Sequence, residues 1–169
     1  MVGLQGAGKS TWVAGHLAGT HVVVSKDHWP HARRREARQQ RVVAELLVAG
    51  RSVVVDNTNP SPADRAPLVA LAVAAGVPAR AVYLDTPLET ALARNEAREG
   101  RARVPLVGVF STRARLVPPS VEEGFAAVER LGQAAGPVVE VRGRGSDAVS
   151  RPEGSRAHTC LRPGPAAQP

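Results

Sequence analysis

The most restrictive feature of the sequence is a glycine-rich octapeptide close to its N-terminus. Residues 3–10 read Gly-Leu-Gln-Gly-Ala-Gly-Lys-Ser and fit the pattern G-x-x-x-x-G-K-[ST] at every fixed position. Glycines let a backbone curl so that successive N–H groups point inward, and the positive end of the next helix adds to their attraction for anions. A chance glycine-rich turn would rarely match in full and run into a helix. The octapeptide therefore predicts a phosphate loop.

Each residue type in this phosphate loop has an expected task. Lys9 would bridge β- and γ-phosphate oxygens of a donor triphosphate, and the Ser10 hydroxyl would ligate Mg²⁺. Around them, the expected nucleotide-binding residues are Gly3, Gly6, Ala7, Gly8, Lys9, Ser10 and Thr11.

The rest of the chain alternates short β-rich runs with stretches rich in Ala, Leu, Arg and Glu. Helices are expected at about residues 10–17, 31–49, 63–75, 87–98, 106–115 and 121–131, and strands at 21–25, 52–55, 79–84 and 138–141. This alternation is typical of a parallel sheet with helices on its faces. We therefore expect an α/β fold of the P-loop NTPase type.

Two segments fall outside that pattern. A phosphate loop normally follows a buried strand, but only Met1 and Val2 precede Gly3, so the first strand is expected to be truncated and the true start to lie upstream. Residues 142–169 are rich in Gly, Pro, Ser and Arg without apolar periodicity, which predicts a disordered tail. The expected kinase-type domain is residues 1–141.

Composition limits the class of protein without deciding it. A chain of 169 residues with 43% hydrophobic content suits one core, and its net charge of +7 fits a protein that handles phosphates, nucleic acid or small metabolites. The single cysteine, Cys160, has no disulfide partner, and no apolar run resembles a membrane span or a signal segment. A cytoplasmic protein without membrane contact is expected.

Two aspartates follow predicted strands, at the sheet edge where such folds carry their ligand crevice. Asp27 comes shortly after the apolar run at 22–24 and could accept a proton from an attacking hydroxyl, although an N-cap role fits its position equally. Asp56 ends the run at 53–55 and suits a Walker B-type acid that orients the magnesium shell. A turn-initiating aspartate is the alternative.

Arginines gather in two places. Arg94, Arg98, Arg101 and Arg103 surround Gly100 and suggest a lid over the donor phosphates, while Glu96 and Glu99 between them also suit a solvated helix face. The second set, Arg33, Arg34, Arg35, Arg38 and Arg41, could meet a polynucleotide backbone or simply face solvent. Trp29, beside Asp27, is the better candidate for stacking on a base, whereas Trp12 is expected in the core.

Together these motifs resemble the kinase domain of the polynucleotide 5′-hydroxyl kinase/3′-phosphatase family. The resemblance covers about residues 3–131. It rests on residues 6–12 (Gly-Ala-Gly-Lys-Ser-Thr-Trp), 25–27 (Ser-Lys-Asp), 53–60 (Val-Val-Val-Asp-Asn-Thr-Asn-Pro), 75–78 (Ala-Gly-Val-Pro), 93–95 (Ala-Arg-Asn), 118–120 (Pro-Pro-Ser) and 123–125 (Glu-Gly-Phe).

The resemblance implies that ATP is the donor and that Asp27 is the general base for an acceptor 5′-OH. It also implies that Lys9 and Ser10 hold the phosphates and Mg²⁺, that Asp56 serves the magnesium region, and that Arg98, with Arg94 nearby, is the lid arginine. The chain departs from the family at Lys26, where arginine is common, and at Pro30, where some members carry an acceptor-binding arginine. The Asp-x-Asp-x-Thr motif of the family's phosphatase half does not occur in residues 1–169.

The sequence thus predicts an ATP- and Mg²⁺-dependent kinase that phosphorylates a hydroxyl, with the 5′-OH of a nucleic acid as the expected acceptor. A small-molecule kinase is the first alternative, in which the basic helix would face solvent. A non-catalytic nucleotide-binding module is the second. A ring-forming motor ATPase is disfavoured, because Asn57 rather than a glutamate follows Asp56.

Overall fold

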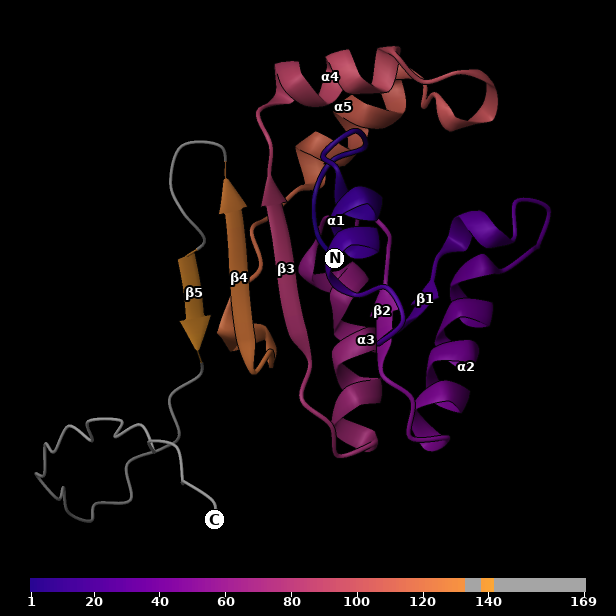
Figure 1. Cartoon of the computed structure of the whole chain (residues 1–169), viewed down its shortest axis with the longest axis vertical. Coiled ribbons are helices and arrows are strands. Elements are labelled where there is room, and N and C mark those ends of the chain that lie inside the picture. The colour runs from indigo at the N-terminus through magenta and orange to yellow at the C-terminus, as the bar shows by residue number, and fades with distance from the viewer. Residues whose placement is uncertain (133–137, 142–169) are drawn as a thin grey trace, which may run out of the picture.

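A mostly parallel sheet with helices on both faces makes up the computed structural model, which describes residues 1–132 and 138–141 (Figure 1). The helices are α1 (Lys9–His16), α2 (Arg35–Val48), α3 (Pro62–Ala74), α4 (Leu88–Glu96) and α5 (Leu106–Arg115), with 3₁₀ turns η1 (Lys26–His28), η2 (Gly100–Ala102) and η3 (Val121–Glu123). The strands are β1 (Val22–Val24), β2 (Val53–Val55), β3 (Arg80–Asp85), β4 (Ala127–Gly132) and β5 (Val138–Val141).

The sheet consists of two groups of strands that Met1 and Val2 connect. β1 pairs in parallel with β2, β3 pairs in parallel with β4, and β5 runs antiparallel to β4. Between the groups, the Val2 N–H donates to Val82 O at 2.8 Å, and the Met1 amine donates to Val55 O of β2 at 3.0 Å. The carboxyl ends of β1, β2 and β3 therefore lie at one edge, beside the residues that follow Val2.

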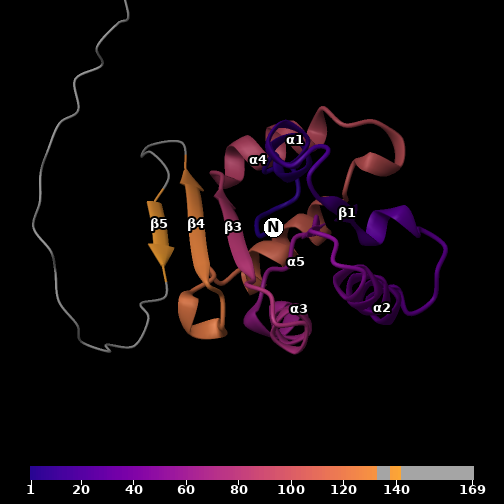
Figure 2. The ribbon, with the colours of Figure 1, turned by 60° about the horizontal axis from the view of Figure 1, so that its bottom comes forward.

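Successive side chains of β3 point to opposite faces of the sheet, so apolar clusters form on both faces. Val82 and Leu84 pack with Ala7, Trp12 and Leu131 on one face, so the expectation of Trp12 in the core is confirmed. Ala81 packs with Val69 of α3, Phe125 and Val128 on the other face. Figure 2 shows α1 and α4 over the first face and α2, α3 and α5 over the second.

The helix ends follow from local sequence. Ser61 and Asp64 form a reciprocal capping box at the start of α3, with Pro62 in the first turn, where its missing N–H does no harm. Gly50 and Gly76 follow α2 and α3 with φ angles of 68° and 67°, values that glycine adopts without the strain that a Cβ would cause.

One predicted helix is wrong. Residues 121–131 were expected to be helical, but only the single turn η3 forms, and β4 replaces the rest. Gly124, with φ at 103°, ends the turn, and the Ala126 N–H donates to Ala79 O at 2.8 Å to begin the pairing with β3. Six residue pairs between β3 and β4 then outweigh the helix propensity of Ala, Glu and Leu.

The other predicted elements are present, with ends that agree with the structure to within four residues, and the predicted strand at 138–141 is β5. The predicted tail, residues 142–169, lies outside the described residues. No helix in the described part of the chain combines the length and apolar character that crossing a bilayer requires.

Candidate active site

The phosphate loop packs against the end of β3 and the first turn of α4. Glycine is required at the two positions where the loop backbone comes closest to these elements. A Cβ on Gly6 would stand 2.2 Å from the carbonyl oxygen of Ala91, and one on Gly3 would stand 2.9 Å from that of Leu84. The φ angles of Gly3, Gly6 and Gly8 are 143°, 79° and 98°, which side chains disfavour. The curl predicted from the glycine spacing is thus built into the packing of the loop.

Lys9 occupies the centre of this loop. Only 8% of the residue is exposed, and its Nζ donates to Gly3 O at 3.0 Å and to Leu4 O at 2.7 Å. Burial lowers the pKa of Lys9 to about 8, although the nearby carboxylate of Asp56 opposes this change. An incoming phosphate would give the ammonium a much better partner than two carbonyl oxygens.

Ser10 and Asp56 meet at the mouth of the loop, from the start of α1 and the end of β2. The Ser10 hydroxyl donates to Asp56 Oδ2 at 2.6 Å. These are hard oxygen donors of the kind that Mg²⁺ prefers, so the pair fits the predicted magnesium region. In residues 1–132 and 138–141 no three His, Cys, Asp or Glu side chains gather around a point. A magnesium ion here would therefore take most ligands from phosphate and water.

Asp27 lies on η1, directly after β1, and its side chain is exposed. Its N–H donates to Ser25 Oγ at 3.3 Å, so Ser25 caps the turn and the Asp27 carboxylate stays available. A pocket of about 340 Å³ opens beside it, and its lining includes Ser10, Ser25, Asp27, His28 and Asp56. One open pocket thus holds the hydroxyl of the phosphate loop and both predicted acids.

Residues 56–60 connect this pocket to the phosphate loop. Asp56 accepts from Ser10, Thr58 O accepts from the Gly3 N–H at 3.1 Å, and Asn59 Nδ2 donates to Met1 O at 2.9 Å. Asn59 is buried with a φ angle of 41°, a left-handed conformation that asparagine tolerates better than most residues. The Asp-Asn-Thr-Asn-Pro run therefore holds the phosphate loop beside the pocket and also supplies the acid Asp56.

The predicted lid arginines lie on α4 and on the loop that follows it. Arg94 Nη1 is 3.7 Å from the point where a Cβ on Gly8 would stand, and the charge of Arg98 acts on Lys9. Arg98 Nη1 donates to Ala102 O at 3.4 Å, and Arg103 pairs with Glu96 at 3.6 Å. The structure therefore brings Arg94 and Arg98 toward the phosphate loop, whereas Arg103 makes the local pair expected of a solvated face.

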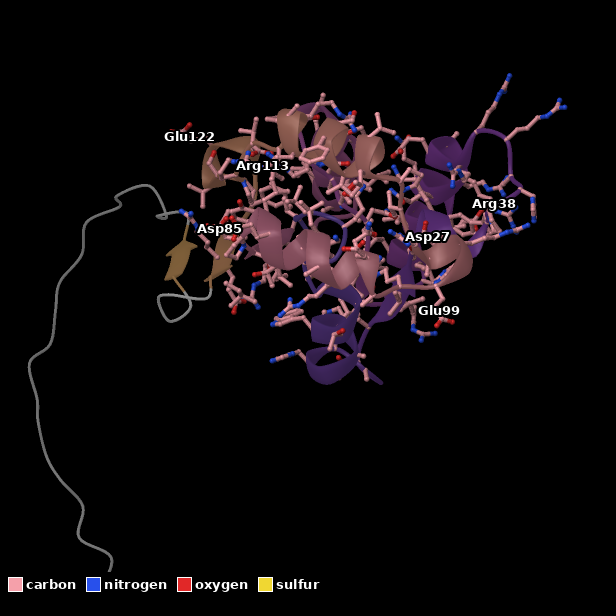
Figure 3. The ribbon with its side chains drawn as sticks, turned by 90° about the horizontal axis from the view of Figure 1, so that it is seen from above. Asp27, Arg38, Asp85, Glu99, Arg113 and Glu122 are labelled. Atoms are coloured by element: carbon pink, nitrogen blue, oxygen red, sulfur yellow. The ribbon has the colours of Figure 1, made fainter. Side chains whose placement is uncertain are left out.

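Asn95 closes this lid loop at its base. It is 1% exposed, its Nδ2 donates to Val104 O at 2.8 Å, and its Oδ1 accepts from the Val104 N–H at 3.0 Å. Figure 1 shows the loop reaching from α4 above the carboxyl edge of the sheet, and Figure 3 shows Glu99 on the same side of the molecule as Asp27. Asn95 was noted in the sequence only as part of the motif at 93–95, and this contact was not predicted.

A basic surface flanks Asp27 on the other side. The arginines that form it, Arg33, Arg34, Arg35, Arg38 and Arg41, are all exposed. The Arg38 guanidinium lies 5.0 Å from the centroid of the Trp29 ring, within the range of a cation–π contact. Figure 3 shows Asp27 and Arg38 on the same side of the molecule, opposite Asp85 and Glu122.

Sequence reasoning missed a buried arginine that holds the end of the Asp-Asn-Thr-Asn-Pro run in place. Arg65 of α3 is 2% exposed and donates to both carboxylate oxygens of Glu123, at 2.7 and 2.6 Å. It also donates to the carbonyl oxygens of Asn59, Pro60 and Val117 at 3.0–3.1 Å. Nothing in the local sequence separates Arg65 from an exposed helix arginine, because two of its partners, Glu123 and Val117, lie 58 and 52 residues away along the chain.

Comparison with known proteins places this geometry among P-loop kinases. Residues 1–119 match the profile of a family described as an AAA domain. The bifunctional polynucleotide phosphatase/kinase of Schizosaccharomyces pombe (strain 972) is 29% identical over 140 residues, covering 78% of this chain and 32% of that protein. The chain thus spans about a third of that relative's length. The resemblance drawn from the motifs is confirmed by these two matches.

A solved structure of similar fold supports the α/β architecture. A sugar kinase from Janibacter sp. HTCC2649, in an unliganded structure, has a TM-score of 0.56 and 21% identity, covering 78% of this chain and 82% of that one. The Mycobacterium tuberculosis APS kinase CysC, in complex with AMPPNP and APS, has a TM-score of 0.48 and 19% identity, covering 79% and 86%. The predicted α/β class, with parallel strands flanked by helices, is confirmed.

Proposed function

The chain belongs to the AAA-domain family of P-loop kinases, and on that premise we propose that it transfers the γ-phosphoryl group of ATP to the 5′-hydroxyl of a nucleic acid. One observation carries the proposal: Ser10 of the phosphate loop, Asp27 and Asp56 line a single open pocket. A hydroxyl bound there would lie next to a carboxylate and within reach of a phosphate held by the loop.

In the proposed reaction the acceptor oxygen attacks the γ-phosphorus of ATP and passes its proton to the carboxylate of Asp27. A bond forms between that oxygen and phosphorus, the bond from phosphorus to the β,γ-bridging oxygen breaks, and ADP leaves. Asp27 suits the role of base because its side chain is exposed to the pocket and its backbone N–H, not its carboxylate, bonds to Ser25.

The donor phosphates would be held by the loop N–H groups, Lys9, Arg94 and Arg98. Lys9 is already charged and desolvated, and fixed charges in such a setting stabilise the transferring phosphoryl group most. Ser10 and Asp56 would hold Mg²⁺, which neutralises charge on the β- and γ-phosphates when bound. The cofactors of the proposed reaction are therefore ATP and Mg²⁺.

Two observations support a nucleic acid as acceptor. Five exposed arginines lie next to Asp27 on the turn before α2 and on α2 itself, a density that suits a phosphate backbone. Trp29, with Arg38 over its ring, offers a flat surface close to the proposed base. The matched relative named as a polynucleotide phosphatase/kinase adds weight to this acceptor class.

A small hydroxylated metabolite is the second candidate acceptor. The pocket of about 340 Å³ is at the lower end of the range typical of small-molecule sites, so it could enclose such a molecule without any use of the basic surface. A metabolite kinase of this kind would be indifferent to added oligonucleotides.

The test is transfer of labelled γ-phosphate from ATP to a 5′-OH oligonucleotide by the wild-type chain, by Asp27→Asn and by Glu122→Gln. Glu122 is an exposed acid on the far side of the molecule (Figure 3), so its variant is the matched control. We expect Asp27→Asn to lower kcat by about 10³-fold or more with ATP affinity retained, and Glu122→Gln to behave as wild type.

Folded protein that binds ATP yet labels no oligonucleotide would overturn the nucleic-acid proposal. Labelling of small hydroxylated metabolites in the same assay would establish the second candidate. Nucleotide binding with no transfer to either class would leave the nucleotide-binding module, the alternative without catalysis.

A further inference from the structure

A chain of side-chain hydrogen bonds runs from α2 to the turn that carries Asp27. The Asn57 Nδ2 donates to Gln39 Oε1 of α2 at 2.5 Å, and Asn57 Oδ1 accepts from the Lys26 N–H at 3.1 Å. The Ser25 hydroxyl donates to the same Oδ1 at 3.4 Å and accepts from the Asp27 N–H at 3.3 Å. Asn57 thus lies between a helix and the first residues of η1.

We propose that Asn57 and Gln39 are positioning residues for Asp27, which fix the turn that aims its carboxylate into the pocket. This inference rests on the proposed function, in which Asp27 is the base that accepts the proton of the acceptor hydroxyl. Neither residue lines the pocket, so each acts through the turn rather than on the acceptor.

The turn needs such support because it has little structure of its own. η1 spans three residues, and its internal hydrogen bonds run from the His28 N–H to Ser25 O and from the Trp29 N–H to Lys26 O, both at 3.2 Å. The N–H groups of Lys26 and Asp27 take their partners from Asn57 Oδ1 and Ser25 Oγ. Without Asn57, the Lys26 N–H would lose its acceptor and the capping hydroxyl its anchor.

Gln39 has a chemical reason to be there. It is fully buried, and its Nε2 has no hydrogen-bond partner. A leucine would fill such a position without leaving a polar atom unpaired, which disfavours a packing role for this amide. Its Oε1 has one task, which is to accept from Asn57 Nδ2 and so hold Asn57 Oδ1 toward Lys26.

The remaining ties between α2 and this turn are weaker. Lys26 pairs with Glu36, and Arg38 lies over Trp29, but both contacts are at the surface. Exposed ion pairs and cation–π contacts restrict a backbone little, because water competes for each partner. The pair formed by the half-buried Asn57 and the fully buried Gln39 is therefore the contact that best fixes where Asp27 lies.

The first experiment measures transfer by Asn57→Leu, Gln39→Met and the matched control Gln40→Met. Gln40 is the next residue of α2 and has no part in the network. We expect kcat to fall about 10²-fold in Asn57→Leu and about 10-fold in Gln39→Met, with KM for ATP within about twofold, because a misplaced base slows chemistry without weakening donor binding.

Combination with Asp27→Asn separates positioning from general destabilisation. If Asn57 acts through Asp27, Asn57→Leu adds nothing measurable to the loss in Asp27→Asn, whereas independent effects multiply. In Asn57→Asp we expect kcat within about tenfold of wild type, since one carboxylate oxygen still accepts from Lys26 and the Gln39 amide can turn to donate through Nε2.

A second readout does not need activity. Amide exchange in residues 25–29 should be at least about tenfold faster in Asn57→Leu than in wild type, while residues 3–11 stay unchanged and Gln40→Met matches wild type. Unchanged exchange in this turn, or multiplicative losses with Asp27→Asn, would overturn the inference. Wild-type protein that transfers nothing would instead overturn the proposed function, and the exchange result would still decide whether Asn57 fixes the turn.

Discussion

The proposed donor and acceptor halves of this site are built by different means. The proposed donor half is backbone: Gly3, Gly6 and Gly8 curl the chain, and the buried Lys9 donates to the carbonyl groups of Gly3 and Leu4. The proposed acceptor half is side chain: an exposed aspartate on a three-residue turn, which is supported by Asn57, 31 residues from Lys26, and through it by Gln39, 18 residues from Asn57. Binding by backbone groups suits the phosphates of a donor that stays the same. Binding by side chains can be changed by substitution, which suits an acceptor that differs between relatives.

The largest expected effect breaks the donor half alone. Lys9→Met should lower kcat/KM by about 10³-fold or more, because no other cation is buried in the loop to stabilise the transferring phosphoryl group. Steady-state kinetics with ATP and oligonucleotide measure it, with circular dichroism to verify the fold. A variant that keeps a tenth of the activity would remove Lys9 from the centre of the proposed site.

The next effect tests whether the phosphate loop tolerates a side chain at Gly6. Gly6→Ala should lower the free energy of unfolding by about 2–4 kcal/mol, because the new Cβ would meet the Ala91 carbonyl at 2.2 Å with φ at 79°. Urea unfolding measures it. Gly15→Ala in α1, where a Cβ has nothing within 4 Å, is the control and should stabilise by about 0.5–1 kcal/mol. Equal effects at both positions would contradict the packing described for the loop.

A third effect follows from the pKa of Lys9. The folded protein releases this proton near pH 8 and the unfolded chain near 10.5. Between these values the unfolded chain binds more protons, so the free energy of unfolding without nucleotide should rise with pH. We expect an increase of roughly 2 kcal/mol from pH 8 to 10.

Urea midpoints at the two pH values test this expectation, with Lys9→Met as the variant in which the rise disappears. The pKa of Tyr83, raised to about 12 chiefly by burial, acts only above pH 10 and in the opposite direction. An identical rise in wild type and variant would assign the pH dependence to another group.

The smallest effect sharpens the acceptor side. Arg38→Gln should raise KM for an oligonucleotide about threefold to fivefold and leave KM for ATP unchanged, because an exposed cation–π contact and one phosphate contact contribute about 1 kcal/mol or less. Arg80→Gln is the control, since Arg80 lies on β3, outside the basic surface, and pairs with Glu129 at 3.8 Å. A change in KM for ATP would mean that the two halves are not separate.

What the sequence predicted follows the same division. The order of strands and helices, the phosphate loop and the meeting of Ser10, Asp27 and Asp56 at one edge depend on local patterns and on a general rule for parallel sheets. The helix expected at 121–131 failed because β3 supplies six pairing partners, which no local pattern reveals. Propensity favoured a helix there, and tertiary pairing decided otherwise.

The supports of the site were not predictable in this way. Asn57 was noticed as part of a motif, but its link to Gln39 depends on how α2 packs beside η1. Arg65 looks like any helix arginine until its five acceptor atoms are seen. In both cases a buried polar group takes at least one partner from a segment distant in sequence, as Gln39 takes Asn57 and Arg65 takes Glu123, and periodicity carries no signal for such contacts.

The contacts of Arg65 limit which substitutions this sequence can accept during evolution. Its planar guanidinium serves three carbonyl groups and one carboxylate in a buried space, so lysine cannot substitute for it. Loss of Glu123 alone would strand a buried cation, and loss of Arg65 alone would strand a carboxylate. Among related sequences, positions 65 and 123 should therefore change together or not at all.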